Sequence, residues 1–414
     1  MPRLVGVRLM KEFMQLDRNL KLRTLTVFLA ALLNSSIYPN MTIYYAKYFG
    51  AVVTGILLMV ISVLSFVAGL YGGHLADSHG RKPIMLAGGI LLTLGYTIAA
   101  AMNNPWLHEP RVTFIAFLVA SVGGSLADPA EQAMMIDSST PRNRKYVYAL
   151  IYWIINISVM LGAAIGGWFF RDYLLELLLV LIGISIFNLC IVRFGMTETL
   201  LVPKTQSDSV WSALKSYMAV LSDRRYMVFL LGLVLLSVIT RQPDYYLAVH
   251  LGNAFHSTHI FGIYVYGQRM LSIITLINTV MIVTMMSAFT RLSERWTLRQ
   301  AYAIGTAFFV VGFAGSFVQQ SFWPLAVSAI ILTIGEMLTV PANQTMRADM
   351  MNPKKIGAYS GANTAVSPIA AVIAGALVSV SGLLGDVGMA GIMVICGVAS
   401  VLLVNHSAKL PASF

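Results

Sequence analysis

The stretch AVVTGILLMVISVLSFVAGLYGGHLADSHGRKP, residues 51–83, decides the fold class of this chain. Its first part, residues 51–75, is a largely apolar run that is long enough to cross a hydrocarbon core of about 30 Å as an α-helix. A short polar turn with Arg81 and Lys82 follows, and a new apolar run begins directly after it. This pattern is typical of two membrane-spanning helices that are joined by a tight basic loop.

Apolar runs of this kind recur from one end of the chain to the other. Of the 414 residues, 57% are hydrophobic and 11% are charged, whereas soluble domains carry about a quarter charged residues. Backbone groups in lipid need internal partners, and the runs lack the alternation of a membrane barrel. We therefore predict an all-α membrane protein with about twelve transmembrane helices, at residues 22–46, 51–75, 83–102, 112–137, 146–170, 174–195, 226–250, 260–288, 299–318, 323–348, 357–380 and 387–405.

Basic residues indicate how the helices cross the membrane. They gather in alternate loops, as the positive-inside rule requires if the N-terminus is cytoplasmic. The predicted outer loops carry only Lys47, Arg111 and Arg171. We expect a multi-pass protein of the bacterial inner membrane with both termini in the cytoplasm. The formal net charge of +11 then reflects topology rather than nucleic-acid binding.

A polar segment divides the chain into two parts. Residues 196–225 are expected to form a cytoplasmic central loop between two six-helix bundles, 1–195 and 226–414. An internal repeat supports this division, because the pattern P-A-x-Q-x-M-x-x-D-x-x-x-P occurs at 129–141 and again at 341–353. Two repeated bundles with a substrate site between them near the midplane are typical of a transporter.

The polar turn carries a family resemblance. Gly73-His-Leu-Ala-Asp77-Ser-His-Gly80-Arg81-Lys82 resembles the G-x-L-a-D-r-x-G-r-k signature of the major facilitator superfamily. Five further segments are similar to the LmrP-type multidrug/proton antiporters of lactic acid bacteria: Met10-Lys-Glu-Phe13, Met41-Thr-Ile-Tyr-Tyr45, Tyr266-Gly-Gln-Arg269-Met-Leu271, Thr333-Ile-Gly-Glu336 and Asp349-Met-Met-Asn-Pro353-Lys-Lys-Ile-Gly357. The resemblance implies two pseudo-symmetric bundles and proton-coupled efflux of lipophilic and cationic drugs by alternating access.

The same resemblance assigns roles to four acids. It implies that Asp77 is a conformational latch and that Asp77, Asp137, Asp244 and Glu336 take part in proton coupling. It further implies that Glu336 and Asp244 bind substrate. Where the family has an aspartate in the fifth helix, this chain has Ile151, so the likeness does not extend to the whole proton pathway.

Two of these acids also stand out by position. Glu336 lies in the middle of an apolar run, where a charge costs at least about 2.5–3.5 kcal/mol, so it is a functional-site candidate. The alternative is a structural, hydrogen-bonded carboxyl. Asp244 follows Arg241 by three residues, which predicts either a direct role or an ion pair on one helix face. Asp137 can alternatively be a solvated acid at a helix end.

Asp128 and Glu131 are possible additional acids. They lie three residues apart around Pro129, and two carboxylates on one face repel each other when both are ionised, which favours proton uptake. The alternative is that both are partly solvated acids near the cytoplasmic half of the helix. Arg269 is expected well inside its predicted helix, where it needs a carboxylate or carbonyl partner.

Catalytic and metal-binding patterns are missing from the sequence. There is no phosphate-binding lysine loop and no nucleophile elbow, so we expect no enzyme and no cofactor. Cys190 and Cys396 lie within apolar runs, and His250, His256 and His259 have no carboxylate near them in sequence, so no metal site is predicted. We expect a monomer whose partners are lipophilic or cationic small molecules, protons and membrane lipids. The rival functions are a transporter of one solute, such as a lipid precursor or sugar, and a non-transport membrane receptor.

Overall fold

The computed structural model describes residues 13–200, 219–352 and 355–411. Most of the predicted central loop, residues 201–218, lies outside the described residues, as do residues 10–12 and 353–354 of the quoted segments. The chain forms two compact units: unit 1 comprises Met1–Ser35, Leu64–Gly162 and Asp172–Val210, and unit 2 comprises Ser36–Val63, Ala163–Arg171 and Trp211–Phe414. The predicted bundle limits at residues 195 and 226 stay a prediction.

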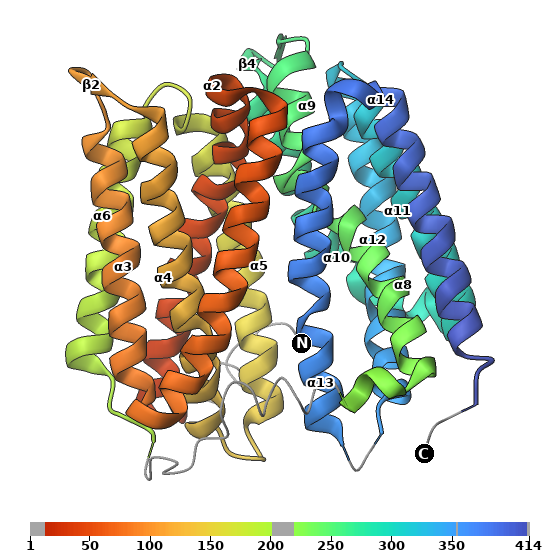
Figure 1. Cartoon of the computed structure of the whole chain (residues 1–414), viewed down its shortest axis with the longest axis horizontal. Coiled ribbons are helices and arrows are strands. Elements are labelled where there is room, and N and C mark those ends of the chain that lie inside the picture. The colour runs from red at the N-terminus through yellow and green to blue at the C-terminus, as the bar shows by residue number, and fades with distance from the viewer. Residues whose placement is uncertain (1–12, 201–218, 353–354, 412–414) are drawn as a thin grey trace. The chain divides into compact units, whose positions relative to one another are not determined.

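Helices make up almost all of the described structure, as expected for an all-α membrane protein (Figure 1). They are α2 Arg18–His79, α3 Arg81–Ala101, α4 Pro110–Asp137, α5 Arg144–Phe169, α6 Leu174–Cys190, α8 Arg224–Thr240, α9 Tyr246–Ala254, α10 Gly267–Ser293, α11 Leu298–Val318, α12 Phe322–Met350, α13 Ile356–Thr364 and α14 Val366–Ser407. Two short antiparallel hairpins join helices: β1 Asn103–Asn104 with β2 Leu107–His108, and β3 Thr258–Ile260 with β4 Ile263–Val265.

The helices account for the expected number of membrane spans. Within the described ranges, 9 helices are long and apolar enough to cross a bilayer. The longest of them contains a break at Gly50, where φ is +75°, so α2 supplies two spans. Segment Ala358–Ser407 supplies two more around Gly385, where φ is +63°. With α8 and α9 as one further, broken span, about twelve spans result, as predicted.

The predicted span 226–250 is interrupted. Helix α8 ends at Thr240, a 3-10 turn covers Gln242–Asp244, and α9 begins at Tyr246. Pro243 explains the break, because proline has no backbone N–H and its ring clashes with the preceding helical turn. This interruption was not predicted from the sequence, and the break places Asp244 outside regular α-helix.

The predicted span 260–288 begins too early. Residues 258–265 form the β3–β4 hairpin, which turns at Phe261 and Gly262 with φ values of +50° and +79°. Helix α10 therefore starts only at Gly267. Phe261 is 90% exposed at the tip of the hairpin. A run of apolar and aromatic residues does not by itself distinguish a short hairpin from a helix end.

Small residues and exposed apolar side chains show how the helices pack. A Cβ on Gly312 would lie 2.5 Å from the backbone nitrogen of Leu332, so α11 and α12 touch through their backbones. Such close contacts are the usual way in which membrane helices associate. On the outside, large apolar side chains such as Leu383 and Leu402 are exposed, as expected for a surface that faces lipid.

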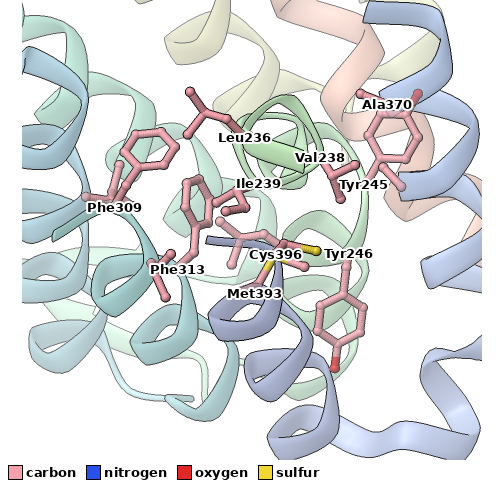
Figure 2. Close-up of a cluster of buried hydrophobic side chains, with 14 of the residues drawn as sticks. Leu236, Val238, Ile239, Tyr245, Tyr246, Phe309, Phe313, Ala370, Met393 and Cys396 are labelled. Carbon is pink, nitrogen blue, oxygen red and sulfur yellow. The ribbon is translucent and has the colours of Figure 1, made fainter. Parts of the chain in front are cut away.

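The core of unit 2 joins α8, α9, α11 and α14. Phe309 and Phe313 from α11 lie beside Ile239 from α8 and Met393 from α14 (Figure 2). This apolar core surrounds the break between α8 and α9 and holds both of its ends in place.

Candidate functional site

The signature turn forms a charged cluster within unit 1. Gly80 separates α2 from α3, so that Asp77 and Arg81 lie in adjacent turns and form an ion pair. The Nε of Arg81 also donates to Asp137 Oδ2 at 3.3 Å, at the last residue of α4. Arg81 thus binds two carboxylates from two helices, both of which the sequence singled out. We call Asp77, Arg81, Asp137 and Glu198 the Arg81 cluster.

Glu198 completes the cluster and was not predicted. Its Oε1 accepts the Arg81 backbone N–H at 3.0 Å, and its Oε2 accepts the Lys82 backbone N–H at 2.9 Å. The carboxylate therefore satisfies free donors at the N-terminus of α3, where negative charge is stabilised. Burial raises the pKa of Glu198, but four backbone N–H groups, of Leu200, Arg81, Lys82 and Thr199, hold it below its ordinary value.

The glycines of the signature differ in what they do. At Gly80 φ is +105°, and a Cβ there would lie 2.6 Å from Glu198 Oε2, so only glycine permits this turn and this close carboxylate. A Cβ on Gly73 would make only ordinary contacts. Lys82 donates from Nζ to the Met196 carbonyl at 2.8 Å and so ties the start of α3 to the segment that carries Glu198.

The two possible additional acids, Asp128 and Glu131, have different hydrogen-bond partners. Glu131 Oε2 lies 2.5 Å from a guanidinium nitrogen of Arg23 in α2, and both side chains are largely buried, with 20% and 7% exposed. Asp128 is exposed and accepts a hydrogen bond from Gln132 at 2.9 Å. Glu131 is thus neutralised by a buried cation, and loss of either partner leaves an uncompensated charge.

Glu336 lies in the middle of α12 and faces α10. Its Oε2 accepts a hydrogen bond from Asn278 Nδ2 at 2.7 Å, and the same amide is 3.3 Å from the buried Thr333 Oγ1. The side chain of Glu336 is half-buried. This site therefore offers a carboxylate that is oriented by a neutral amide at mid-helix, with its other oxygen available to a proton or a cation.

Asp244 ends the 3-10 turn between α8 and α9. It is exposed, although it lies in the interior of a broken membrane span. Its carbonyl accepts a hydrogen bond from Thr42 Oγ1 at 2.6 Å, which fixes the break against α2. The predicted helical pairing with Arg241 is wrong, because the helix ends before both residues; Arg241 donates to the Ser367 hydroxyl instead.

The break sends two adjacent tyrosines in opposite directions (Figure 2). The hydroxyl of Tyr245 lies 3.2 Å from Ser62 Oγ in α2. The hydroxyl of Tyr246 donates to Asp386 Oδ1 in α14 at 2.6 Å. Asp244 is thus followed directly by two hydrogen-bonded tyrosines, and its own carbonyl accepts from Thr42. These contacts fix the position of the break.

Arg269 lies in the first turn of α10, not well inside a helix as predicted, because α10 begins at Gly267. It donates to the Tyr264 carbonyl at 2.6 Å and stacks on Tyr266, with 4.7 Å between the guanidinium and the ring centre. These contacts tie the β3–β4 hairpin to α10, and they give Arg269 the carbonyl partner that the sequence required.

The three histidines lie in different environments. His256 and His259 are exposed, whereas His250 is buried in α9. His250 nevertheless has a carboxylate partner far away in sequence, since Asp386 Oδ1 is 3.1 Å from its Nδ1. The 136 positions between the two residues explain why sequence spacing did not reveal the pair.

Comparison with known proteins now identifies the family. The family model described as Major Facilitator Superfamily matches residues 24–274, which is more than half of the chain. The chain belongs to the Major Facilitator Superfamily. Curated relatives of this superfamily member are transporters, and the comparisons indicate no catalytic family.

Two relatives illustrate its similarities. It is 27% identical to a Na(+), Li(+), K(+)/H(+) antiporter of Planococcus maritimus, over 84% of this chain and 85% of that protein. It is 23% identical to the multidrug resistance protein MdtH of Proteus mirabilis, over 78% of this chain and 77% of that protein.

Solved structures agree on the fold of this superfamily member. The match to a peptide transporter POT in complex with sulfate has a TM-score of 0.74 at 15% identity. It covers 95% of this chain and 94% of the POT chain. The match to a nucleoside transporter NupG has a TM-score of 0.72 at 14% identity and covers 95% of this chain and 99% of the NupG chain. At such identities the likeness concerns the fold alone.

Two residues of the site in this superfamily member, Asn278 and Glu198, were not predicted, and only Asn278 carries a signal in the sequence. Asn278 is an amide within an apolar run, and a polar group at that depth indicates a partner. Glu198 is an acid directly after the sixth apolar run, but nothing local distinguishes it from an ordinary loop acid.

Proposed function

We propose that this chain is a secondary active transporter that exports lipophilic and cationic compounds in exchange for protons by alternating access. The observation that supports it most is Glu336, a half-buried carboxylate at the middle of α12 whose nearest described partner is the neutral Asn278. A proton and a cationic substrate compete for such a group, and this competition couples the two flows.

Asp244 is the second acid of the proposal. Membrane helices that are broken at mid-span expose backbone groups and side chains to ligands, and transporter sites are often built there. Asp244 lies at such a break, and its side chain is exposed. In the proposal it shares substrate and protons with Glu336, whereas Asp77 and Asp137 couple protonation to closure through Arg81.

The proposed setting is the bacterial inner membrane, with both termini in the cytoplasm and a monomer as the working unit. The similarity to proteins named multidrug resistance protein and cation/H(+) antiporter agrees with proton exchange as the energy source.

The test is dye transport in inside-out vesicles with an acidic lumen. The native chain is expected to move a lipophilic cationic dye into the lumen only while the proton gradient persists. Glu336→Gln removes the charge but keeps the shape, and we expect at least a tenfold lower initial rate at equal expression. Glu294→Gln, an exposed acid at the end of α10, is the matched control and should retain the native rate.

Other outcomes have definite meanings. If the native chain moves no dye at any gradient, multidrug efflux is wrong, and a single-solute transporter becomes the better hypothesis. If no solute flux of any kind is found, the receptor hypothesis takes its place. If Glu336→Gln transports as fast as the native chain, Glu336 is structural.

Alkali-cation exchange is a second candidate, and the relative from Planococcus maritimus favours it. Carboxylate, amide and hydroxyl oxygens, such as those of Glu336, Asn278 and Thr333, are suitable ligands for hard cations. In the same vesicles, addition of Na⁺ would then collapse the proton gradient without any dye, and it would not do so in Glu336→Gln.

A further inference from the structure

A buried polar cluster lies at the end of unit 2 that carries α9 and the β3–β4 hairpin, opposite α13 (Figure 1). His250 is its centre, with a side chain that is only 1% exposed. Its Nδ1 lies 3.1 Å from Asp386 Oδ1, and its Nε2 lies 2.9 Å from the Gln319 carbonyl oxygen. Tyr246, one turn before His250 in α9, donates its hydroxyl to the same Asp386 oxygen at 2.6 Å.

This arrangement determines how many protons the cluster holds. The Gln319 carbonyl can only accept, so the Nε2 of His250 must carry a hydrogen. The contact between Nδ1 and Asp386 Oδ1 needs one further proton, which resides either on the imidazole or on the carboxyl. A neutral histidine facing an ionised aspartate cannot satisfy both contacts at once, and one pair of acceptors would then face each other.

Among the described residues, no third charged side chain forms an ion pair with His250 or Asp386. From α9, Tyr246 faces it, and the ring of Phe317 in α11 packs edge-on against that tyrosine, with 4.8 Å between ring centres. Helix α10 packs on α9 through Gly267, where a Cβ would lie 2.1 Å from the Leu251 carbonyl. The guanidinium of Arg269 near that end of α10 donates to Tyr264 instead.

The pair connects α9 to two places where helices end or break. Gln319 is the residue that caps α11, Asp386 follows the break of α14 at Gly385, and His250 lies in α9. Helix α9 has 9 residues, which is too short to be stable without such contacts. Its first residue follows Asp244 within two positions, so a shift of α9 moves the break directly.

We propose that His250 and Asp386 bind one dissociable proton, and that its release loosens α9 and thereby the break that carries Asp244. The site is open to solvent through Asp386, whose side chain is 37% exposed. In the proposed topology this end of unit 2 faces outward, so the proposal takes the proton from the outer face. Its effect on transport rests on the proposed antiport, whereas proton binding itself does not.

The proton is tested directly by nuclear magnetic resonance of the full chain with ¹⁵N-labelled histidine in lipid nanodiscs. We expect one histidine to show a titration that is coupled to a carboxyl group and to disappear in His250→Gln. In Asp386→Asn, this titration should shift. The exposed His256→Gln is the control and should leave it unchanged. A His250 signal that is insensitive to both pH and Asp386→Asn contradicts the proposal.

The loosening is tested by hydrogen exchange of residues 246–254 against pH, after division by the intrinsic exchange rate. The closed state binds one more proton than the loosened state, so protection decreases with rising pH by up to tenfold per pH unit across the titration. His250→Gln should show fast, pH-independent exchange, whereas the donor-only His250→Lys should keep α9 protected to higher pH. Equal loosening in both variants would indicate damage to packing and would overturn the switch.

Dye transport separates this inference from the proposed function. If the native chain moves no dye but the histidine titration and the exchange profile behave as expected, antiport is wrong and the proton site stands. If dye transport is gradient-driven but residues 246–254 exchange independently of pH, the proton site is wrong and antiport stands.

Discussion

At the scale of single residues, Gly80 and Glu198 depend on each other. The positive φ of Gly80 turns the chain so that α3 starts directly after α2, and the missing side chain leaves room for the carboxylate that caps α3. The Gly80-Arg81-Lys82 part of the signature thus has a local physical meaning. The residue that makes use of it is 118 positions further along the chain, at Glu198.

Gly80→Ala is expected to destabilise unit 1. A non-glycine residue with the φ and ψ of Gly80 costs about 1–3 kcal/mol, and the new Cβ displaces the Glu198 carboxylate. Thermal unfolding in detergent should show a lower midpoint, and dye transport should be reduced. Gly183→Ala is the control, because a Cβ in that position of α6 meets nothing within 4 Å. An unchanged midpoint in Gly80→Ala would mean that the turn relaxes freely.

The stabilising effect of Glu198 should depend on pH. Its pKa is lower in the folded state, so the ionised carboxylate stabilises the fold above the unfolded pKa of about 4.5, and this contribution is lost as pH decreases through the folded value. Glu198→Gln should therefore unfold at a lower temperature than the native chain at pH 7. The two midpoints should approach each other as the pH falls below 4.5 and through the lower pKa of the folded state. If the difference between the two unfolding midpoints stays constant over this pH range, the charge of Glu198 does not stabilise the fold.

At the scale of elements, the contact of α11 with α12 depends on small residues. Gly312 and Gly335 bring the two backbones together, and Glu336 follows the second of these contacts directly. The position of the candidate carboxylate is therefore set by helix packing as well as by Asn278. The break between α8 and α9 likewise sets the position of Asp244.

Gly312→Val is expected to separate α11 from α12. Its added carbons would overlap the Leu332 backbone, and overpacking of this kind costs about 1–3 kcal/mol. The measurement is the yield of monodisperse protein together with its unfolding midpoint. Gly391→Val in α14, where a Cβ meets nothing within 4 Å, should behave like the native chain. If Gly312→Val and Gly391→Val lower the unfolding midpoint equally, the β-branched residue itself is responsible rather than the contact between α11 and α12.

At the scale of the whole molecule, the proposed orientation has a direct test. In a Cys190→Ser background, which removes the exposed native thiol, Trp106→Cys places a thiol at the tip of the β1–β2 hairpin. It should react with an impermeant maleimide in intact cells. Glu294→Cys, in the loop after α10, should react only after permeabilisation. The reverse pattern would place the termini outside.

The sequence by itself determined the fold class and most span limits. Run length and hydropathy are local properties, so the break near Gly50 and the ends of α3, α4 and α11 were predictable within a few residues. The late start of α10 and the interruption at Pro243 were missed, because apolar runs of similar composition form hairpins and 3-10 turns when tertiary contacts favour them.

Glu336 and Asp244 stood out in the sequence because charge near lipid is rare. Asp77 and Asp137 stood out only through the family resemblance. Only the tertiary structure decided their partners. Asn278 is 58 positions from Glu336, Glu198 is 117 from Arg81, and Asp386 is 136 from His250. No local period encodes such distances, since the packing of whole helices brings these side chains together. The sequence determines the chemistry of these side chains, but the fold determines which of them pair.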